Sequence, residues 1–598
     1  MDKNKKIIKK TIRVKKNTKK SKSTDLPSTT RKIDNTQTNN SISDIDIKKI
    51  IKANNAVVED VNQILHNEGI EFTCRLDIII NFLNHKYYGK KLNVNIRTEI
   101  VNEILSLLDI LIIDRNELFQ KLFMFYCNKK TKINLDQYYT PFTIGQFISK
   151  LMIPGKKLID PACGTGDLAI NYNGNITLWD ISPDVISVCK SNYELNDKKY
   201  NIDCLNSITE YEKDNDTYDY CCLNPPFGSS TVIKNTDVLD KYILGKGKKK
   251  EEIGILFIER GINLVKNNGI VFIILPNGYL GNSTKNTKLL RDYLLSYRIL
   301  SVIELPGNTF SRSGTGVSTS LVILQKSKVK EPYNIFIKKI DNIGYVLNKK
   351  NTPYKYKTFN GKYILENNKP VLDNDFVDCY CQVSSFVKDN DTTNLSITKT
   401  DTVDYEIVNT SQLQDNILDI NRYLSQYKSI IELAKSRNLK TINHYLKSKV
   451  NSKFKIVGDK EYIYLDIKQI TTPIYGKGNI IYGYDLPGRA KIKVMKHDII
   501  VSKLKGKITF TMIMDDTDNI ICSNGFTLLR PKDYNSGVIL FANLFTDMFK
   551  IQHKSLCTGS IMETITETDI KNIYITEDVD LDKYTKILDA LSIINNEL

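Results

Sequence analysis

The chain has 598 residues, with 85 Lys and Arg against 68 Asp and Glu, and a formal net charge of +17. At roughly 100–200 residues per domain, this length predicts about three to five domains. Its 11 cysteines are too sparse for a disulfide scaffold, and no two have the CxxC spacing of a zinc site. We therefore expect no metal and a reducing, cytoplasmic compartment. No apolar run approaches the roughly 20 residues that cross a bilayer, and the basic start lacks the apolar segment of a secretory signal, so no membrane association is expected.

The positive charge is a weak guide to partners. The chain has 72 Lys and only 13 Arg, and Asn and Ile are abundant, which is the composition of an AT-rich coding sequence. Residues 1–34 carry a net charge of +10, so the rest of the chain carries only +7. Residues 1–42 have almost no apolar side chains, which predicts a disordered basic tail. Such a tail either binds nucleic acid phosphates, acts as a targeting signal for the protein or is simply solvated.

A helical domain is expected first, over residues 43–132. Apolar residues recur at helical spacing from Ile51 to Leu65, and two further helical runs cover Ile78–Leu83 and Ile100–Phe125.

Residues 133–330 alternate buried strands with helices, and these helices include Pro183–Tyr193 and Ile253–Val265. This alternation predicts an α/β fold with a doubly wound, Rossmann-like parallel sheet. The expected strands are Lys157–Ile159, Ile176–Trp179, Tyr218–Leu223, Ile270–Leu275, Ser301–Leu305 and Ser320–Leu324.

The last part of the chain is more mixed. Residues 331–410 read as a connecting region of short strands and polar turns. We expect an α+β domain over residues 411–598. It should contain a helix over 411–445, a strand-rich stretch over 446–578 and a closing helix over Leu581–Asn595.

The first motif with chemical content is the turn after the first strand, Asp160-Pro161-Ala162-Cys163-Gly164-Thr165-Gly166-Asp167. Gly164 and Gly166 lack a Cβ, so the backbone can lie close to a ligand at the end of the strand. An ordinary tight strand-to-helix turn is the alternative.

The next strand ends in an acid, Asp180, 20 residues after Asp160. An acid at this offset can hold the ribose hydroxyls of a nucleoside-type cofactor. A helix N-cap at Asp180 is the alternative. Ile181 and Trp179 can pack against an adenine ring or belong to the core.

A strand then runs into Asn224-Pro225-Pro226-Phe227. The two prolines fix the backbone, so that the Asn224 side-chain oxygen and the Pro225 carbonyl face one site with an aromatic ring beside it. Two acceptors and a ring suit an exocyclic amine on a planar base, which offers two N–H groups and a π face. A plain Asn-Pro turn is the alternative.

With these motifs in order, the chain resembles the S-adenosylmethionine-dependent N6-adenine DNA methyltransferases. The resemblance implies that Asp160, Pro161, Gly164, Gly166, Asp180 and Ile181 bind the cofactor and that Asn224, Pro225, Pro226 and Phe227 bind a flipped adenine. The segment Asp136–Pro141 resembles the family's Gln-x-x-Thr-Pro segment, which implies that Gln137, Thr140 and Pro141 close over the methionine end of the cofactor. Gly269–Asn277, Ile303–Pro306 and Thr319–Lys326 are similar to type I modification subunits.

One position departs from the family. An acid is expected near the cofactor adenine after the third strand, and Asn206 stands there, with Asp203 three residues earlier. Asn206 can still accept a hydrogen bond through its amide oxygen.

The last third resembles the target-recognition domain of type I specificity subunits. The residues that carry this resemblance are Gly488–Ala490, Val494–Lys503, Ser523–Pro531 and Thr558-Gly559-Ser560. Arg489, Lys503, Lys505 and Lys507 are candidates for contacts to phosphates or base edges, or else form a solvated basic face.

The resemblance thus implies site-specific N6 methylation of adenine in double-stranded DNA, with S-adenosylmethionine as cofactor. A specificity subunit, a restriction subunit or a second copy of the chain are the expected protein partners. Two alternatives stay open: methylation of another amine, such as a protein glutamine or an RNA adenine, and a non-catalytic DNA-binding subunit.

Overall fold

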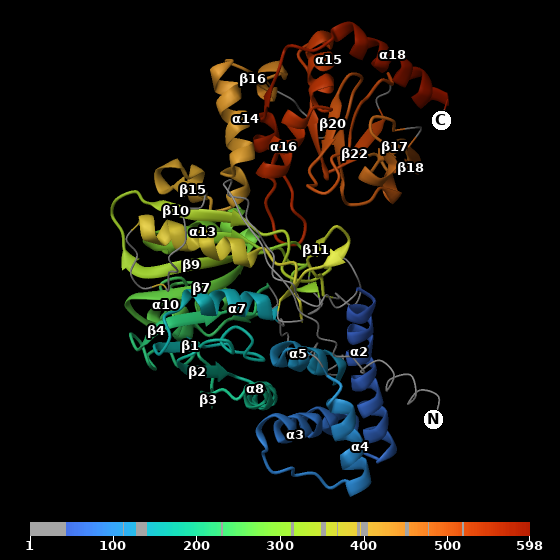
Figure 1. Cartoon of the computed structure of the whole chain (residues 1–598). Helices are drawn as coiled ribbons and strands as arrows, with labels where there is room; N and C mark the ends of the chain where they lie inside the picture. The colour runs from blue at the N-terminus through green and yellow to red at the C-terminus, as the bar shows by residue number, and fades with distance from the viewer. Residues whose placement is uncertain are drawn as a thin grey trace, which may run out of the picture. The chain divides into compact units, whose positions relative to one another are not determined.

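Nine strands form the central sheet of the computed structural model (Figure 1). The structure describes residues 44–111, 113–126, 140–228, 231–311, 316–347, 354–366, 369–390, 395, 405–448, 454–475, 478–516 and 519–597. The predicted basic tail and Gln137 lie outside the described residues.

The strand order is β15-β10-β8-β9-β7-β4-β1-β2-β3. The bounds are β1 (Lys157–Asp160), β2 (Asn175–Asp180), β3 (Asn201–Cys204), β4 (Tyr218–Leu223), β7 (Val265–Pro276), β8 (Tyr297–Glu304), β9 (Thr319–Lys328), β10 (Asn334–Lys339) and β15 (Glu406–Asn409). All six predicted strands are present, and the α/β prediction is confirmed.

The sheet is mixed, however, and the prediction of a parallel sheet was wrong in this respect. β9 runs antiparallel to both β7 and β8, and β15 runs antiparallel to β10. A parallel return needs a long crossover, usually a helix. The described residues of the connection from β8 to β9 contain no α-helix, so the chain returns antiparallel.

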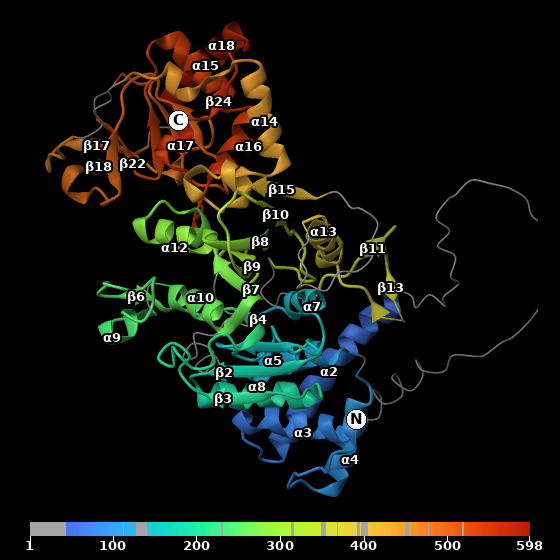
Figure 2. The same cartoon turned by 90° about the vertical axis from the view of Figure 1, so that its left-hand side faces the viewer.

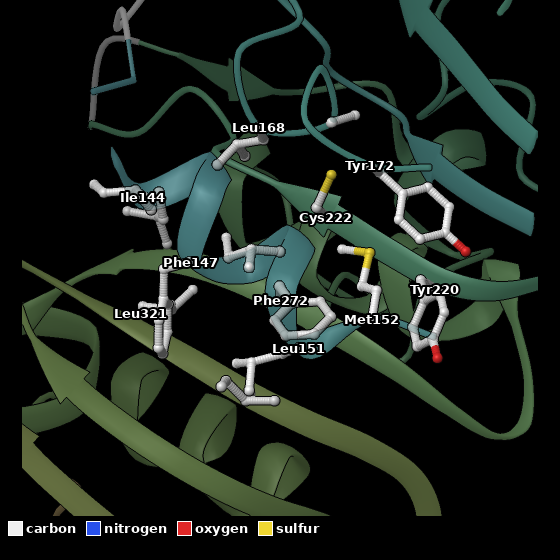
Figure 3. Close-up of a cluster of buried hydrophobic side chains, with 14 of the residues drawn as sticks. Ile144, Phe147, Leu151, Met152, Leu168, Tyr172, Tyr220, Cys222, Phe272 and Leu321 are labelled. Carbon is white, nitrogen blue, oxygen red and sulfur yellow. The ribbon is translucent and has the colours of Figure 1, made fainter. Parts of the chain in front are cut away.

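Helices cover both faces of this sheet. On one face lie α7 (Phe142–Leu151), α8 (Pro183–Leu195) and α13 (Phe376–Asp389), and on the other lie α10 (Ile253–Leu264) and α12 (Lys285–Leu295). Because side chains alternate along a strand, neighbouring residues such as Phe272 and Ile273 enter different cores. Figure 3 shows side chains of α7 packed toward Phe272 and Leu321.

The helical prediction for the N-terminal region is confirmed, with one correction. The helices are α2 (Asp44–Asn67), α3 (Arg75–Tyr88), α4 (Thr98–Leu108) and α5 (Arg115–Tyr126), with a 3-10 turn η1 (Phe72–Cys74). The single run expected over Ile100–Phe125 is two helices, because the Asp114 carboxylate accepts the Asn116 N–H at 2.9 Å and starts a new one. Their core also takes in Leu195 of α8. Figure 2 shows α8 beside α3.

Short elements fill the connections. They are β5 (Val232–Ile233), α9 (Thr236–Leu239), β6 (Glu251–Glu252), α11 (Asn277–Gly281), β11 (Thr358–Phe359), β12 (Lys362–Tyr363), β13 (Leu365–Glu366) and β14 (Lys369–Pro370).

The long helix expected over residues 411–445 is wrong. The chain forms the 3-10 turns η3 (Thr410–Gln412), η4 (Gln414–Asn416) and η5 (Ile420–Arg422) before α14 (Ser425–Ser436). Asp415 and Asn416 have positive φ angles of 50° and 55°, which an α-helix cannot accommodate.

Residues 440–597 combine strands with helices. The strands form a four-stranded sheet in the order β18-β17-β22-β19, a three-stranded sheet in the order β21-β20-β23 and the pair β16-β24. Their bounds are β16 (Lys440–Thr441), β17 (Glu461–Leu465), β18 (Asn479–Tyr482), β19 (Ala490–Lys493), β20 (Ile499–Ser502), β21 (Phe510–Met512), β22 (Ile520–Ser523), β23 (Phe526–Leu529) and β24 (Tyr574–Ile575).

The helices of this region are α15 (Tyr534–Asn543), α16 (Asp547–Leu556), α17 (Glu567–Lys571) and α18 (Leu581–Glu597), with 3-10 turns η6 (Ile442–Tyr445), η7 (Ile467–Gln469) and η8 (Gly483–Asp485). The closing helix is confirmed as α18. The strand-rich prediction did not include α15, α16 and α17. In α15 the run Val538–Ala542 is almost wholly buried and apolar, and such a run has no helical periodicity to read.

Candidate functional site

The site lies where three neighbouring parallel strands end. β1 pairs with β2 on one side and with β4 on the other. The carboxyl ends of these strands bring Asp160, Asp180 and Asn224 to the same edge of the sheet, where α/β sheets bind ligands.

Asp180 holds the turn that follows β1. The Gly164 N–H donates to Asp180 Oδ2 at 3.1 Å, and the Ser182 N–H donates to Oδ1 at 3.0 Å. Ser182, not Asp180, is the N-cap of α8. Burial raises the pKa of Asp180, while these backbone donors favour its charged form. A carboxylate has further lone pairs, so Asp180 can accept additional hydroxyl donors.

Two more carboxyl groups lie in the same turn, and both are buried. Burial, with a smaller effect from the Asp180 charge, raises the pKa of Asp160 to about 8. Burial also raises the pKa of Asp167 to about 6, against hydrogen bonds from Thr165 and Gln120. Burial thus favours the protonated forms of these carboxyl groups, and a positively charged ligand beside them would favour their ionised forms.

The two glycines of the turn have different surroundings. Gly164 has a φ of +52°, and a Cβ added there would meet no atom within 4 Å. Gly166 has a φ of +80°, and its Cβ would lie 2.4 Å from Tyr193 Cε2 and 2.8 Å from Cys189 Sγ. Gly164 thus leaves space for a ligand, whereas Gly166 allows the turn to pack against α8.

The side-chain amide of Asn224 is the central polar group of the site. Its Nδ2 donates to Thr140 Oγ1 at 3.0 Å. Its Oδ1 is buried, yet no described residue donates a hydrogen bond to it. A buried acceptor without a donor is unfavourable, so its presence points to a donor that arrives with a ligand.

Thr140 is in turn held by a buried amide that sequence reasoning missed. Gln120 Nε2 lies 2.9 Å from Asp167 Oδ1 and 3.3 Å from the Thr140 carbonyl oxygen. The Gln120 side chain therefore connects the turn after β1 with the segment that orients Asn224. Its signal in the sequence was a glutamine between the apolar residues Phe119 and Leu122 on a predicted helix.

The rest of the Asn-Pro-Pro-Phe segment packs into the protein. Pro225 is buried, Pro226 is half-buried and only 7% of Phe227 is exposed. A Cβ added to Gly254 would lie 2.9 Å from the Pro226 carbonyl oxygen, so the N-terminus of α10 supports this segment directly. Pro141, which was assigned to the cofactor by resemblance, is buried as the N-cap residue of α7.

The residues expected near an adenine ring separate into two groups. Ile181 is 65% exposed beside Asp180, while Trp179 is fully buried in the core and does not line the site. Asn206 Oδ1 already accepts the Ile208 N–H at 3.0 Å, so the amide oxygen of Asn206 stabilises a local turn.

The basic candidates of the C-terminal region are mostly engaged within the protein. Arg489 pairs with Asp466 at 2.6 Å, Lys505 pairs with Glu563 at 2.8 Å, and Lys503 Nζ donates to the Asn524 carbonyl at 3.2 Å. Lys507 is exposed. Within the described ranges, no group of three or more His, Cys, Asp or Glu residues could hold a metal ion. No helix in the part of the chain that the structure describes is long and apolar enough to cross a membrane.

Comparison with known proteins gives the following matches. Residues 117–400 match the family model described as N-6 DNA Methylase. The type I restriction enzyme EcoEI methylase subunit of Escherichia coli is 21% identical over 224 residues, which cover 33% of this chain and 43% of that subunit. The match thus spans less than half of the length of this curated relative.

Two solved structures are similar over longer stretches. A modification subunit of a type I restriction enzyme from Vibrio vulnificus is 14% identical, and the match covers 60% of this chain and 93% of that one, with a TM-score of 0.39. The type IIG restriction endonuclease BpuSI is 13% identical over 90% of this chain and 72% of its own, with a TM-score of 0.45. The family assignment rests on the sequence matches: residues 117–400, which carry the candidate site, match the N-6 DNA methylase family model, and the chain is similar to a type I methylase subunit.

Proposed function

We propose that the chain is an adenine-specific DNA methyltransferase that transfers a methyl group from S-adenosylmethionine to the exocyclic amine of a flipped adenine in duplex DNA. The observation that carries this proposal is the buried Oδ1 of Asn224, which has no donor among the described residues. It lies beside the acidic turn in a segment of the N-6 DNA methylase family.

The turn after β1 fits S-adenosylmethionine. Gly164 leaves open space, Asp180 retains acceptor capacity for ribose hydroxyls and Ile181 offers an exposed apolar side chain. The positive charge of the bound cofactor would favour the ionised forms of the nearby carboxyl groups of Asp160, Asp167 and Asp180. The bound cofactor would supply a methyl group on an activated sulfonium.

The protein then has to position the amine. The lone pair of an adenine amine is delocalised into the ring, which makes the nitrogen a poor nucleophile. A hydrogen bond from this amine to Asn224 Oδ1, with the Pro225 carbonyl as the second proposed acceptor, draws the nitrogen toward a tetrahedral geometry. The catalytic contribution is thus orientation more than proton transfer. A base within a duplex cannot reach such a site, so the adenine has to be turned out.

The region 411–598 is proposed to select the DNA sequence, and the helical region 43–132 to support the methyltransferase core at 133–330. Methylation of a protein glutamine or an RNA adenine would use the same acceptors. A non-catalytic subunit would have no use for an unpaired buried acceptor, which disfavours that alternative.

The test compares Asn224→Ala with the wild-type protein. We expect Asn224→Ala to lose methyl transfer by about a hundredfold or more, because removing one stabilising acceptor has effects of this order. Binding of S-adenosylmethionine, measured by calorimetry, should stay within about threefold, since Asn224 does not belong to the turn. Full transfer activity in this variant would refute the assignment of Asn224.

A further inference from the structure

A small hairpin from the C-terminal region lies at the edge of the sheet that carries the site. Thr558 and Thr564 pair through both backbone hydrogen bonds, Thr558 N to Thr564 O at 2.9 Å and Thr564 N to Thr558 O at 2.8 Å. The hairpin of residues 558–564 contains the Thr558-Gly559-Ser560 motif that the proposed catalytic chemistry leaves unexplained.

Ser560 fastens this hairpin to the catalytic sheet. Its Oγ accepts the Gly278 N–H at 2.6 Å, and its carbonyl oxygen accepts the Ser318 N–H at 2.6 Å. Gly278 lies in α11, directly after β7, and Ser318 directly precedes β9. Both contacts are therefore at the edge where β7 ends and β9 begins.

Glycines make this close contact possible. A Cβ on Gly278 would lie 2.7 Å from Ser560 Oγ, and a Cβ on Gly281 would lie 3.1 Å from Thr558 Cγ2. Gly559 has a φ of +129°, and its Cβ would lie 2.6 Å from the Met562 carbonyl oxygen. The turn at Gly559 thus fixes the shape of the hairpin, and Gly278 and Gly281 of α11 allow the hairpin to pack closely against that helix.

This fixed base presents two apolar side chains to solvent. Ile561 is 80% exposed and Met562 is 70% exposed. Exposing two adjacent large apolar side chains gives no folding stabilisation, because folding gains free energy from burying apolar area. Their exposure on an anchored turn leaves both side chains available to an external partner.

The hairpin is close to the Asn224 segment. β4 and β7 are neighbouring parallel strands, and they lead into Asn224 and α11 respectively. A Cβ on Gly254 would lie 2.9 Å from the Pro226 carbonyl and 3.4 Å from the Tyr279 hydroxyl of α11. Gly254 of α10 thus lies beside both the Pro226 carbonyl and the hydroxyl of Tyr279, a side chain of the helix on which the hairpin rests.

We propose that Ile561 and Met562 enter the base stack of duplex DNA beside the target adenine and occupy the space that the adenine leaves when it turns out. This inference rests on the proposed function and adds to it the residues that support base flipping. Apolar side chains inserted between base pairs offset part of the free energy of unstacking. A tip of two side chains is far smaller than the roughly 1,200 Å² that stable protein–protein interfaces bury, but is sufficient for a wedge in DNA.

The test uses the full chain with both residues replaced, Ile561→Ser with Met562→Ser. The matched control is Ile593→Ser on α18, where the side chain is 61% exposed and lies outside the hairpin. Wild-type protein first methylates unmethylated plasmid DNA, and the modified positions are mapped by long-read sequencing. Two synthetic duplexes then carry the mapped sequence: one fully paired, the other with an abasic site opposite the target adenine.

We expect the double variant to transfer labelled methyl groups to the paired duplex at least about tenfold more slowly than wild type, because unstacking has lost its support. On the abasic duplex, where flipping is easier, the difference should shrink to about threefold or less. Ile593→Ser should transfer methyl groups at the wild-type rate on both duplexes. The temperature of thermal unfolding and the affinity for S-adenosylmethionine should be the same in the wild type, the double variant and Ile593→Ser.

The proposal that Ile561 and Met562 enter the base stack would be overturned by either of two results. One is a wild-type transfer rate for the double variant on the paired duplex, and the other is an equal fall in transfer rate on both duplexes. No methyl transfer by the wild-type protein to any DNA is a separate result: it would refute the proposed function, and the wedge with it.

Discussion

At the scale of single residues, Gln120 connects two parts of the site that are far apart in sequence. Its Nε2 donates to Asp167 and to the Thr140 carbonyl, and the Thr140 hydroxyl accepts from Asn224. Gln120→Glu keeps the shape but places an acceptor against a carboxyl group. Since an unsatisfied buried polar group costs about 1–3 kcal/mol, we expect kcat to fall by about tenfold or more.

The matched control for this change is Gln63→Glu on α2, whose side chain bonds Asn67 at an exposed position. Steady-state kinetics should show no change there. A wild-type kcat for Gln120→Glu would mean that the amide does not position Asn224.

The two glycines of the turn should respond differently to alanine. Gly166→Ala places a Cβ 2.4 Å from Tyr193 at a φ of +80°, so it should lower the free energy of unfolding by about 1–3 kcal/mol or more. Gly164→Ala meets no atom within 4 Å and should cost stability only about 1 kcal/mol through its φ. It should instead weaken S-adenosylmethionine binding.

Thermal unfolding and calorimetric titration separate these outcomes. If both variants lost stability equally and bound S-adenosylmethionine equally well, Gly164 would not face the ligand.

At the scale of elements, the turn after β1 makes stability depend on pH. The folded pKa of Asp160 is about 8, well above its unfolded value near 3.8. The folded state therefore binds more protons between these values, and this contribution to stability is lost progressively as pH rises from about 4 to about 8. In the variant Asp160→Asn, the side chain at this position cannot ionise. Relative to this variant, wild type should lose free energy of unfolding as pH rises from about 6 to about 9.

Urea unfolding at several pH values measures this difference. A constant difference between wild type and Asp160→Asn over that range would contradict the raised pKa. Both proteins should be compared without S-adenosylmethionine, because its positive charge would favour the ionised carboxyl group.

Some of the strands and helices could be predicted from the sequence and others could not. The strands ending at Asp160, Asp180 and Leu223 are short, mostly apolar segments with turn residues after them, so both the sheet and the edge that carries the site were predictable. The direction of β9 was not, because strand patterns do not record orientation. The helix expected from Ser411 failed at Asp415 and Asn416, whose φ angles depend on tertiary packing. The role of Gln120 could not be predicted from the sequence, because its hydrogen-bond partners Asp167 and Thr140 come together only in the folded chain.

At the scale of the whole molecule, the net charge of +17 is concentrated at one end, since residues 1–34 carry +10. Deleting these residues should weaken affinity for duplex DNA and reduce its dependence on salt, because fewer phosphates are neutralised. The same adenines should be methylated, since the tail is not expected to read bases. Binding titrations at several salt concentrations and mapping of methylated sites test both statements. A changed set of sites would contradict them.

The identity of the product tests the central proposal most directly. The full chain is incubated with S-adenosylmethionine carrying a deuterated methyl group and with unmethylated duplex DNA, and the DNA is digested to nucleosides for mass spectrometry. We predict that the label appears as N6-methyladenine. Unlabelled DNA, or label found instead on a protein glutamine or on RNA, would contradict the proposed function.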